Sequence, residues 1–480
     1  MAVDRASSAQ VGREADEWPA VLAGLRVWRT IPTEATRQWP HLCVGCGFGA
    51  RQQPKRRACA SDAWSTKGRV GEGRGRPPAY NPRVPIYLDH AATTPLRPEA
   101  LEAMLPYLGG EFGNPSSPHS YGRRARAALD AAHERIAAQI NAGPREVILT
   151  SGGTEALNLA LKGAAWAGKT RGHRIVTSAV EHHAVLHSLQ QLEKFGFEIV
   201  ELPVDRYGRV DPDHVAGALN ERTTVVSIQL ANNEVGTLQP VEAIGRVVRE
   251  KGPKGCLFVV DAVAGAAWLP IDVDAFNCDL LAIAGHKLDG PKGIGALYLR
   301  RGTHILAQQQ GGTQERYRRA GTEDVAAAVG MGVAFELAVA ERDVTVKRVR
   351  KLRDRLRGAV LAEDGVELTG HPRDRLPNLL SVVVGDADGA SIVVKLDLAG
   401  VAASVGSACT TGSTDPSHVL TAMGYPDDEA RGSLRLSLGR TTTDDEIDAA
   451  IAVIPRVLAE SRAAAAVLAA DPLGQGVGVA

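Results

Sequence analysis

The chain has 480 residues, of which 44% are hydrophobic and 23% are charged, a composition typical of a globular protein with more than one core. Lys plus Arg equals Asp plus Glu, at 55 each, so no net charge favours binding to nucleic acid or to an anionic membrane. No apolar run reaches the roughly 20 residues of a membrane span, and the amino terminus lacks the apolar core of a secretory signal, so we expect a cytoplasmic protein with no membrane association.

Residues 1–80 differ in composition from the rest of the chain. They hold most of the tryptophans and end in the basic, Gly- and Pro-rich run KGRVGEGRGRPPAYNPR, which is typical of a linker. Cys43 and Cys46 form a CxxC motif with Cys59 nearby, but a single CxxC is weak evidence for zinc or redox chemistry. We expect a poorly ordered or dispensable extension, and metal binding there stays an open alternative.

From VPIYLDHAATTP onward, short β-branched runs alternate with Ala-rich helical stretches. This pattern predicts an α/β fold with a parallel-rich sheet covered by helices on both faces. After about residue 340, a charged helix, two shorter strands and a final helix indicate a smaller α+β domain. We therefore expect a large domain over residues 97–343 and a small domain formed by residues 84–96 and 344–470.

Lys287 stands in DLLAIAGHKLDGPKG, after an apolar strand and before a Gly/Pro turn. Ligands of open α/β sheets bind at the carboxyl ends of the strands, where this lysine is expected to lie. A lysine flanked by apolar residues can act as an amine nucleophile or form a Schiff base. Taken alone, however, the motif is better explained by an ordinary surface lysine.

Two further strand ends favour the chemical interpretation. Asp261 ends the apolar run CLFVVDA, where an acid needs a cationic partner to stay charged. The run VILTSGGTEALNLALKG predicts a strand, a Gly-Gly-Thr turn and a helix, whose first N–H groups suit a phosphate. An imine-forming lysine, a carboxylate for a ring nitrogen and a phosphate site together specify pyridoxal 5′-phosphate (PLP). The run GPKGIGALYLR does not match a dinucleotide-binding motif, because its glycines have the wrong spacing and precede a strand.

With these motifs the sequence resembles the class V, fold-type I PLP-dependent transferases, and among them the cysteine desulfurases of the NifS/IscS group. The resemblance covers nearly everything after residue 84, in the order of the family. It runs through YLDHAATTPLRPEAL, FGNPSSPHSYG, SGGTEALNLA, VEHHAV, ANNEVGTLQP, GHKLDGPKGIGALY, GGTQERYRRAGTED, GSACTTGSTDPSHVL and SLRLSLGRTTTDDEID. It implies a large domain with a mostly parallel seven-stranded sheet, a smaller α+β domain and a homodimer.

The resemblance also implies roles for residues around the cofactor. Lys287 would hold PLP as an imine, Asp261 would pair with the ring nitrogen, and His182 would stack on the ring and assist proton transfer. The other implied contacts of PLP are Asn233 with its phenolic oxygen, Gly153, Thr154 and His286 with its phosphate, and Thr322 with the phosphate of the partner subunit.

The substrate implied by the resemblance is L-cysteine, with Arg435 and Asn233 binding it. Arg435 alternates with Leu434 and Leu436, so it faces away from the apolar side of its strand, as an anion clamp requires. We expect no metal in this site.

Cys409 lies alone in AASVGSACTTGSTDP, and the residues around it leave open a packing, disulfide, metal-binding or nucleophilic role. The resemblance makes it the nucleophile that takes sulfur from L-cysteine as a persulfide, leaving L-alanine. Small residues in the surrounding loop, about 404–417, would let the thiol move between the cofactor and a sulfur-acceptor protein. Cys256 and Cys278 lie in or beside apolar runs and are expected to be packing residues.

Two positions depart from the family pattern. Ala264 stands where the family has a Gln that donates to the phenolic oxygen, and Ala284 stands where it has a phosphate-binding Ser. Each lost charge-assisted hydrogen bond is worth about 1.5–3 kcal/mol unless water or a neighbouring hydroxyl replaces it. We expect weaker PLP retention or a shifted imine pKa rather than loss of activity.

Two other functions stay open at this point. A selenocysteine lyase or another class V lyase would share Lys287 and Asp261 without needing the long loop around Cys409. A PLP-binding scaffold weakened by Ala264 and Ala284 would dock sulfur-transfer partners without turnover. The acceptor pathway is also open among iron–sulfur cluster biogenesis, tRNA thiolation, cofactor synthesis and DNA phosphorothioation.

Overall fold

The computed structural model describes residues 86–406 and 416–470, with side chains up to residue 465. The predictions on residues 1–80, including Cys43, Cys46 and Cys59, and the prediction on Cys409 lie outside the described residues. No helix in the described ranges is both long and apolar enough to cross a membrane.

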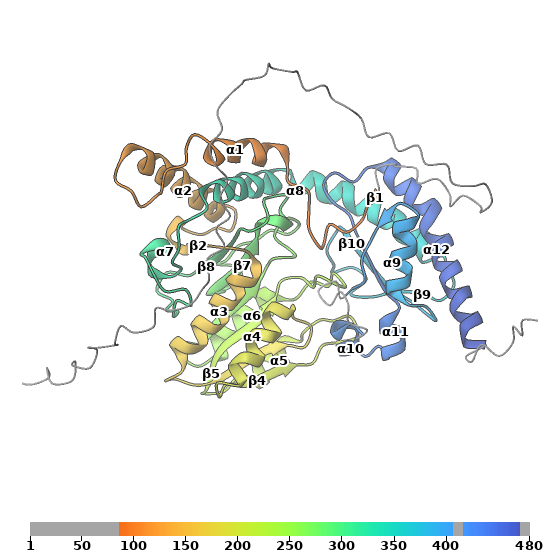
Figure 1. Cartoon of the computed structure of the whole chain (residues 1–480). Coiled ribbons are helices and arrows are strands. Elements are labelled where there is room, and N and C mark those ends of the chain that lie inside the picture. Colours follow the sequence, from red (N-terminus) through yellow and green to blue (C-terminus); the bar gives the residue numbers. More distant parts are fainter. Residues whose placement is uncertain (1–85, 407–415, 471–480) are drawn as a thin grey trace, which may run out of the picture. The chain divides into compact units, whose positions relative to one another are not determined.

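The largest sheet has seven strands in the order β2-β8-β7-β6-β5-β3-β4 (Figure 1). Its strands are parallel from β4 to β7, and β8 runs antiparallel to both neighbours, so the predicted mostly parallel seven-stranded sheet is confirmed. The strands are β2 (Val147–Thr150), β3 (Arg174–Ser178), β4 (Glu198–Leu202), β5 (Thr223–Gln229), β6 (Leu257–Asp261), β7 (Leu280–Ala284) and β8 (Gly295–Leu299).

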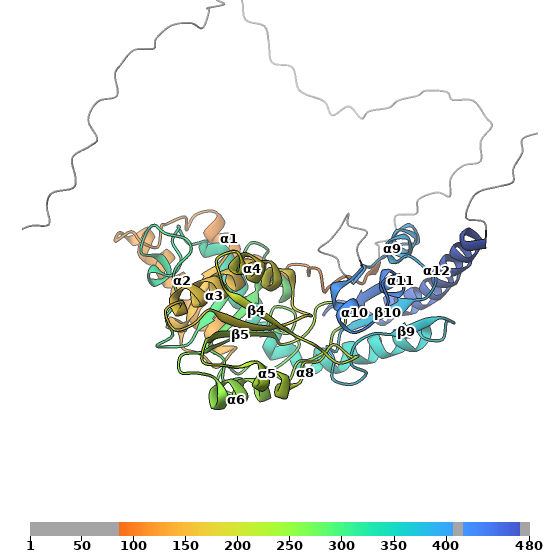
Figure 2. The ribbon, with the colours of Figure 1, turned by 90° about the horizontal axis from the view of Figure 1, so that it is seen from below.

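Helices cover both faces of this sheet, as Figure 2 shows for α3 and α4 on one side and α5 and α6 on the other. The strands are apolar on both sides: in β6, Phe258 and Val260 join one core cluster while Val259 joins the other. The covering helices are α2 (Ser120–Ala138), α3 (Gly153–Gly168), α4 (His183–Glu193), α5 (Pro212–Ala218) and α6 (Val241–Lys251).

A second core lies around a three-stranded antiparallel sheet of order β12-β10-β9, beside the parallel pair β1 and β11. Leu380, Val382 and Leu436 of this sheet pack in one cluster with apolar residues of α8, α9 and α12. The elements are β1 (Ile86–Tyr87), β9 (Val366–Leu368), β10 (Leu379–Val384), β11 (Val401–Ala402), β12 (Ser433–Ser437), α9 (Gly389–Leu398) and α12 (Asp444–Ala470).

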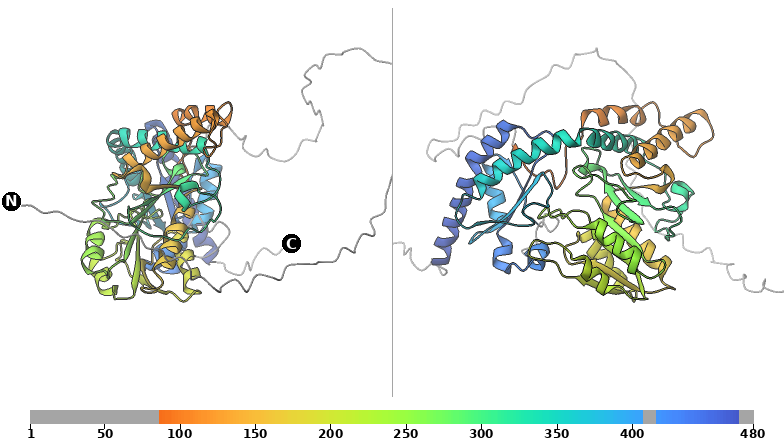
Figure 3. Two further views of the ribbon diagram at one scale, coloured as in Figure 1. Left: turned by 90° about the vertical axis from the view of Figure 1, so that its left-hand side faces the viewer. Right: turned by 180° about the vertical axis from the view of Figure 1, so that it is seen from behind.

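Helix α8 (Val325–Val360) contributes to both cores (Figure 1 and Figure 3). Phe335 packs in the core of the seven-stranded sheet, and Leu352 packs in the core of the three-stranded sheet. The helix begins well before the charged stretch predicted from the sequence, because Asp324 caps it by accepting a hydrogen bond from the N–H of Ala327 at 2.9 Å. The predicted boundary at residue 343 falls inside α8, and the division into two domains stays a proposal.

Short elements complete the described chain. They are α1 (Pro98–Leu108), α7 (Gln314–Tyr317), α10 (His418–Ala422), α11 (Asp427–Arg431) and the 3₁₀ helices η1 (Pro144–Glu146) and η2 (Gly285–Lys287).

Candidate active site

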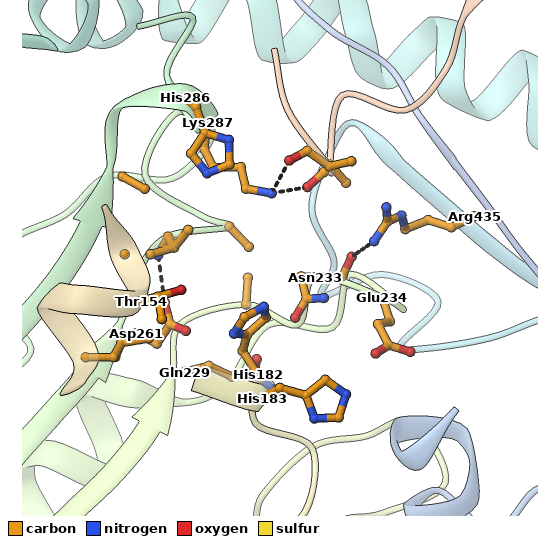
Figure 4. A pocket seen from close by; sticks show the side chains of 18 of the residues that line it. Thr154, His182, His183, Gln229, Asn233, Glu234, Asp261, His286, Lys287 and Arg435 are labelled. Carbon is orange, nitrogen blue, oxygen red and sulfur yellow. Dashed lines mark hydrogen bonds between the residues drawn. The ribbon is translucent and has the colours of Figure 1, made fainter. Parts of the chain in front are cut away.

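A cavity of about 340 Å³ lies where strands of the seven-stranded sheet end, and β12 contributes one residue to its wall. Most of the residues singled out from the sequence line this cavity together (Figure 4). They are Gly153, Thr154, His182, Asn233, Asp261, His286, Lys287 and Arg435.

Lys287 enters the cavity from η2, directly after β7. Its Nζ donates hydrogen bonds to the carbonyl oxygens of Ala91 and Ala92, the latter at 2.8 Å (Figure 4). The lysine amine is therefore held at a defined position by a segment almost 200 residues earlier in the chain.

Asp261 is the last residue of β6 and is 6% exposed. Burial raises the pKa of its carboxyl to about 6, against the opposing effects of a hydrogen bond from the N–H of Val263 and the charge of Lys287. The bond from Val263 is 2.9 Å long. A buried acid of this kind gains most from a cationic partner within the cavity, such as a protonated ring nitrogen.

His182 is the N-cap residue of α4, and its Nδ1 accepts a hydrogen bond from the N–H of Ala184 at 3.0 Å. This bond assigns the proton of the neutral ring to Nε2. Burial, followed by the nearby charge of Lys287, lowers the pKa of His182 to about 4. The ring is therefore neutral at physiological pH.

The amino terminus of α3 forms another wall of the cavity, where Gly153 and Thr154 begin the helix. A Cβ atom on Gly153 would come within 2.7 Å of a methyl group of Val263, so a larger residue here would require that side chain to move. Free N–H groups at a helix start bind anions such as phosphate. His286 stands opposite, with Nδ1 at 3.3 Å from Oγ1 of Thr93, and burial lowers its pKa to about 4.

Arg435 lies in β12 and is 2% exposed, although it carries a full charge. Its Nη2 donates to Oδ1 of Asp89 at 3.0 Å, and its Nη1 donates to the carbonyl oxygen of Asn233 at 3.0 Å. Leu434 and Leu436 point into the core, so Arg435 faces the other side of the strand, toward the cavity.

Glu181 is a buried residue beside the site that the sequence analysis did not single out. Its Oε1 accepts hydrogen bonds from Oγ of Ser178 at 2.7 Å and from the N–H of Gln229 at 3.0 Å. Burial, with a smaller contribution from Asp261, raises the pKa of Glu181 to about 8, so the carboxyl is protonated at neutral pH. Its position directly before His182 was the available sequence signal.

Asp89 and Glu234 are further acids near the cavity that sequence reasoning missed. Asp89 pairs with Arg435, and Glu234 lines the cavity and accepts a hydrogen bond from Oγ of Ser417 at 2.6 Å. Asp89 stood in the quoted run YLDH, where an acid after an apolar strand was a usable signal.

Other predicted positions are placed as follows. Ala264 and Ala284 both line the cavity, whereas Thr322 is exposed and is not part of the cavity wall. Cys256 and Cys278 are buried free thiols, as expected, and burial raises the pKa of each to about 12. Within the described residues no group of His, Cys, Asp and Glu has the arrangement of a metal site.

Comparisons with known proteins agree with this architecture. The family described as "Aminotransferase class-V" matches residues 86–450. The protein named cysteine desulfurase IscS of Methanosarcina thermophila is 46% identical over 377 residues, which cover 78% of this chain and 93% of that protein. The IscS of Dictyoglomus turgidum is 47% identical over 378 residues, 78% of this chain and 95% of its own.

Solved structures of similar proteins match the chain over most of its length. A structure titled "NIFS-LIKE PROTEIN" matches with a TM-score of 0.74 and 34% identity, over 78% of this chain and 100% of that one. The structure of DndA from Streptomyces lividans matches with a TM-score of 0.63 and 35% identity, over 73% and 99% of the two chains.

Proposed function

The chain belongs to the class V aminotransferase family, in its cysteine desulfurase group, and from this premise we propose that it removes sulfur from L-cysteine with PLP bound to Lys287. The observation that carries the proposal is the convergence of Lys287, Asp261 and His182 in one cavity. The product is L-alanine, and the sulfur passes to Cys409.

The residues of the cavity fit PLP. Lys287 would hold PLP through its amine, and the buried carboxyl of Asp261 suits the ring nitrogen. The amino terminus of α3, which begins with Gly153, suits the phosphate together with Thr154 and His286. When bound, PLP supplies a ring that withdraws electrons from the Cα of an amino acid.

Arg435 and His182 suit the handling of the substrate. Arg435 is a buried cation that lines the cavity, so its guanidinium suits a substrate carboxylate. His182 holds its proton at Nε2, and the amine of Lys287 lies in the same cavity, so both groups can take part in proton transfer.

In the sulfur-transfer step, the thiolate of Cys409 attacks the sulfur of the substrate. An S–S bond forms and the C–S bond of the substrate breaks, with its electron pair returning to the carbon. That carbon takes up a proton, so the organic product leaves as alanine. A reducing cytoplasm suits a free reactive thiol, and we place the reaction there.

The proposal includes a homodimer in which Thr322 reaches the cofactor phosphate of the partner subunit. The exposed position of Thr322 is consistent with this role. A sulfur-acceptor protein completes the set of partners.

Chemical trapping tests the cofactor assignment. Reduction of the PLP-loaded protein with borohydride should fix a pyridoxyl group on the peptide that contains Lys287, as measured by mass spectrometry. Lys287→Ala should show neither this adduct nor the visible absorbance of the imine. An adduct on another lysine would contradict the assignment.

A further inference from the structure

We propose that Asp89 is a positioning residue for the substrate, which holds the carboxylate-binding Arg435 at a fixed separation from Lys287. The inference rests on the proposed function, because it assumes that the ligand is an α-amino acid. The ion pair between Nη2 of Arg435 and Oδ1 of Asp89 measures 3.0 Å, and the two side chains are 2% and 20% exposed. Because the pair is largely buried, water and salt screen its attraction little, so the attraction is stronger than in a surface ion pair.

Asp89 is itself fixed by hydrogen bonds to the strand that carries Arg435. The N–H of Ser437 donates to the carbonyl oxygen of Leu88 at 2.7 Å, and Oγ of Ser437 accepts from the N–H of Ala91 at 2.8 Å. The N–H of Ala92 closes a turn on the carbonyl oxygen of Asp89 at 3.0 Å. The aspartate therefore belongs to a rigid turn, residues 89–92, docked on β12.

The same turn holds Lys287. The carbonyl oxygens of Ala91 and Ala92 accept hydrogen bonds from its Nζ. A second link follows directly, since Oγ1 of Thr94 donates to the carbonyl oxygen of His286 at 2.9 Å. Turn 89–92 thus connects a residue of the three-stranded sheet to a residue at the end of the seven-stranded sheet.

An α-amino acid carries its carboxylate and its amine on one carbon, so the groups that bind them need a fixed spacing. Arg435 lies in the three-stranded sheet and Lys287 follows a strand of the seven-stranded sheet, and turn 89–92 contacts both residues. At one end of the turn, the side chain of Asp89 binds Arg435. At the other end, the carbonyl groups of Ala91 and Ala92 bind Lys287.

The charge of Asp89 is needed because the other partners of Arg435 are weaker. Its Nη1 contacts neutral carbonyl groups of Asn233 and Gly406, at 3.0 and 3.5 Å. Glu234 lines the same cavity and offers an alternative carboxylate. Without Asp89, the guanidinium can turn toward Glu234 and leave the position that matches a substrate carboxylate.

Steady-state kinetics of the PLP-loaded full chain test this role. Asp89→Ala should raise KM for L-cysteine about tenfold or more while kcat stays within about threefold, because ground-state and transition-state binding of the carboxylate are lost together. Asp89→Asn keeps an oxygen that accepts from Nη2 but removes the charge, so its KM should lie between those of the wild type and Asp89→Ala. Asp279→Ala is the control, since Asp279 is a buried acid that pairs with the exposed Arg249 at 2.6 Å and does not line the cavity.

Binding to a protein that cannot transfer sulfur separates this inference from the proposed function. In a Cys409→Ser background, the Kd of L-cysteine, followed by cofactor absorbance, should rise with Asp89→Ala by the same factor as KM. The Kd of cysteamine, which has the amine and thiol but no carboxylate, should stay unchanged. If the wild type makes no alanine, the proposed function fails while this binding comparison still decides the role of Asp89. An unchanged or lower Kd for L-cysteine in Asp89→Ala, or an equal loss for cysteamine, would overturn the inference.

Discussion

Asp261 and Lys287 follow adjacent parallel strands of one sheet, β6 and β7, and the charge of the lysine lowers the pKa of the aspartate against the effect of burial. Burial is the larger effect, since the pKa of Asp261 still lies near 6. The pair places an amine and a carboxylate in one cavity at the carboxyl edge of the sheet.

Asp261→Asn is expected to stabilise the cofactor-free protein and to abolish its activity when PLP is added. Because burial raises the pKa of Asp261 to about 6, above an unfolded value of about 3.9, its contribution to stability is present at low pH and is lost as the pH rises through 6. At pH 7.5 the variant should be more stable by up to about 3 kcal/mol, and near pH 4 the two proteins should be equally stable. Urea unfolding at both pH values measures this difference. Equal stability of the two proteins at pH 7.5 would contradict the claim that ionisation of the buried Asp261 destabilises the folded state.

Substitutions of His182 can distinguish its role as the N-cap of α4 from the role of its ring in proton transfer. His182→Ala removes the acceptor for the N–H of Ala184, so it should lose about 1 kcal/mol of stability, whereas His182→Asn retains an acceptor and should lose little. Both should reduce kcat by about 10²–10⁴-fold if the ring assists proton transfer. Thermal unfolding and alanine release measure the two effects. Normal turnover in His182→Asn would show that the histidine is only a helix cap.

Glu181 should make the free energy of unfolding decrease as the pH rises into the alkaline range. Burial raises the pKa of its carboxyl to about 8, from about 4.3 when unfolded, so its contribution is fully present at acid pH and is lost as the pH rises through 8. Glu181→Gln keeps an oxygen for Ser178 and Gln229 but cannot ionise. The variant should match the wild type near pH 6 and be more stable at pH 9 in urea unfolding. Parallel loss of stability in both proteins would argue against this assignment.

Ala264 and Ala284 both line the cavity, so restoring the polar residues of the family should strengthen PLP binding. Each gained hydrogen bond is worth about 1.5–3 kcal/mol, and the Ala264→Gln, Ala284→Ser double variant should hold PLP at least about tenfold more tightly. Spectroscopic titration of the cofactor-free proteins measures both dissociation constants. Equal constants would mean that water or another hydroxyl already fills these contacts.

The strands of the large sheet and the positions of Asp261 and Lys287 were predictable, because the local sequence pattern determines them. Apolar runs such as CLFVVDA are buried on both faces of the sheet, and Asp261 and Lys287 lie at strand ends as expected. The start of α8 was missed, since its first half is Ala- and Gly-rich and its helical state depends on packing against α1 and α2.

The supporting contacts of the site were not predictable from local pattern. Asp89 and Arg435 are separated by 346 positions, and nothing near either residue specifies the other. The buried environment of Glu181 likewise comes from Ser178 and Gln229 on two different strands. Such pairs depend on how the sheets and turn 89–92 come together.

The most direct test of the account is the turnover of L-cysteine by the PLP-loaded protein, beside a Cys409→Ser variant. Alanine and sulfide are measured in the presence of a reducing thiol that releases the sulfur. The account predicts turnover by the wild type and little by the variant. Equal turnover by both proteins would point to a lyase that needs no persulfide, and no turnover by either would point to a scaffold; each result would contradict a desulfurase that uses Cys409.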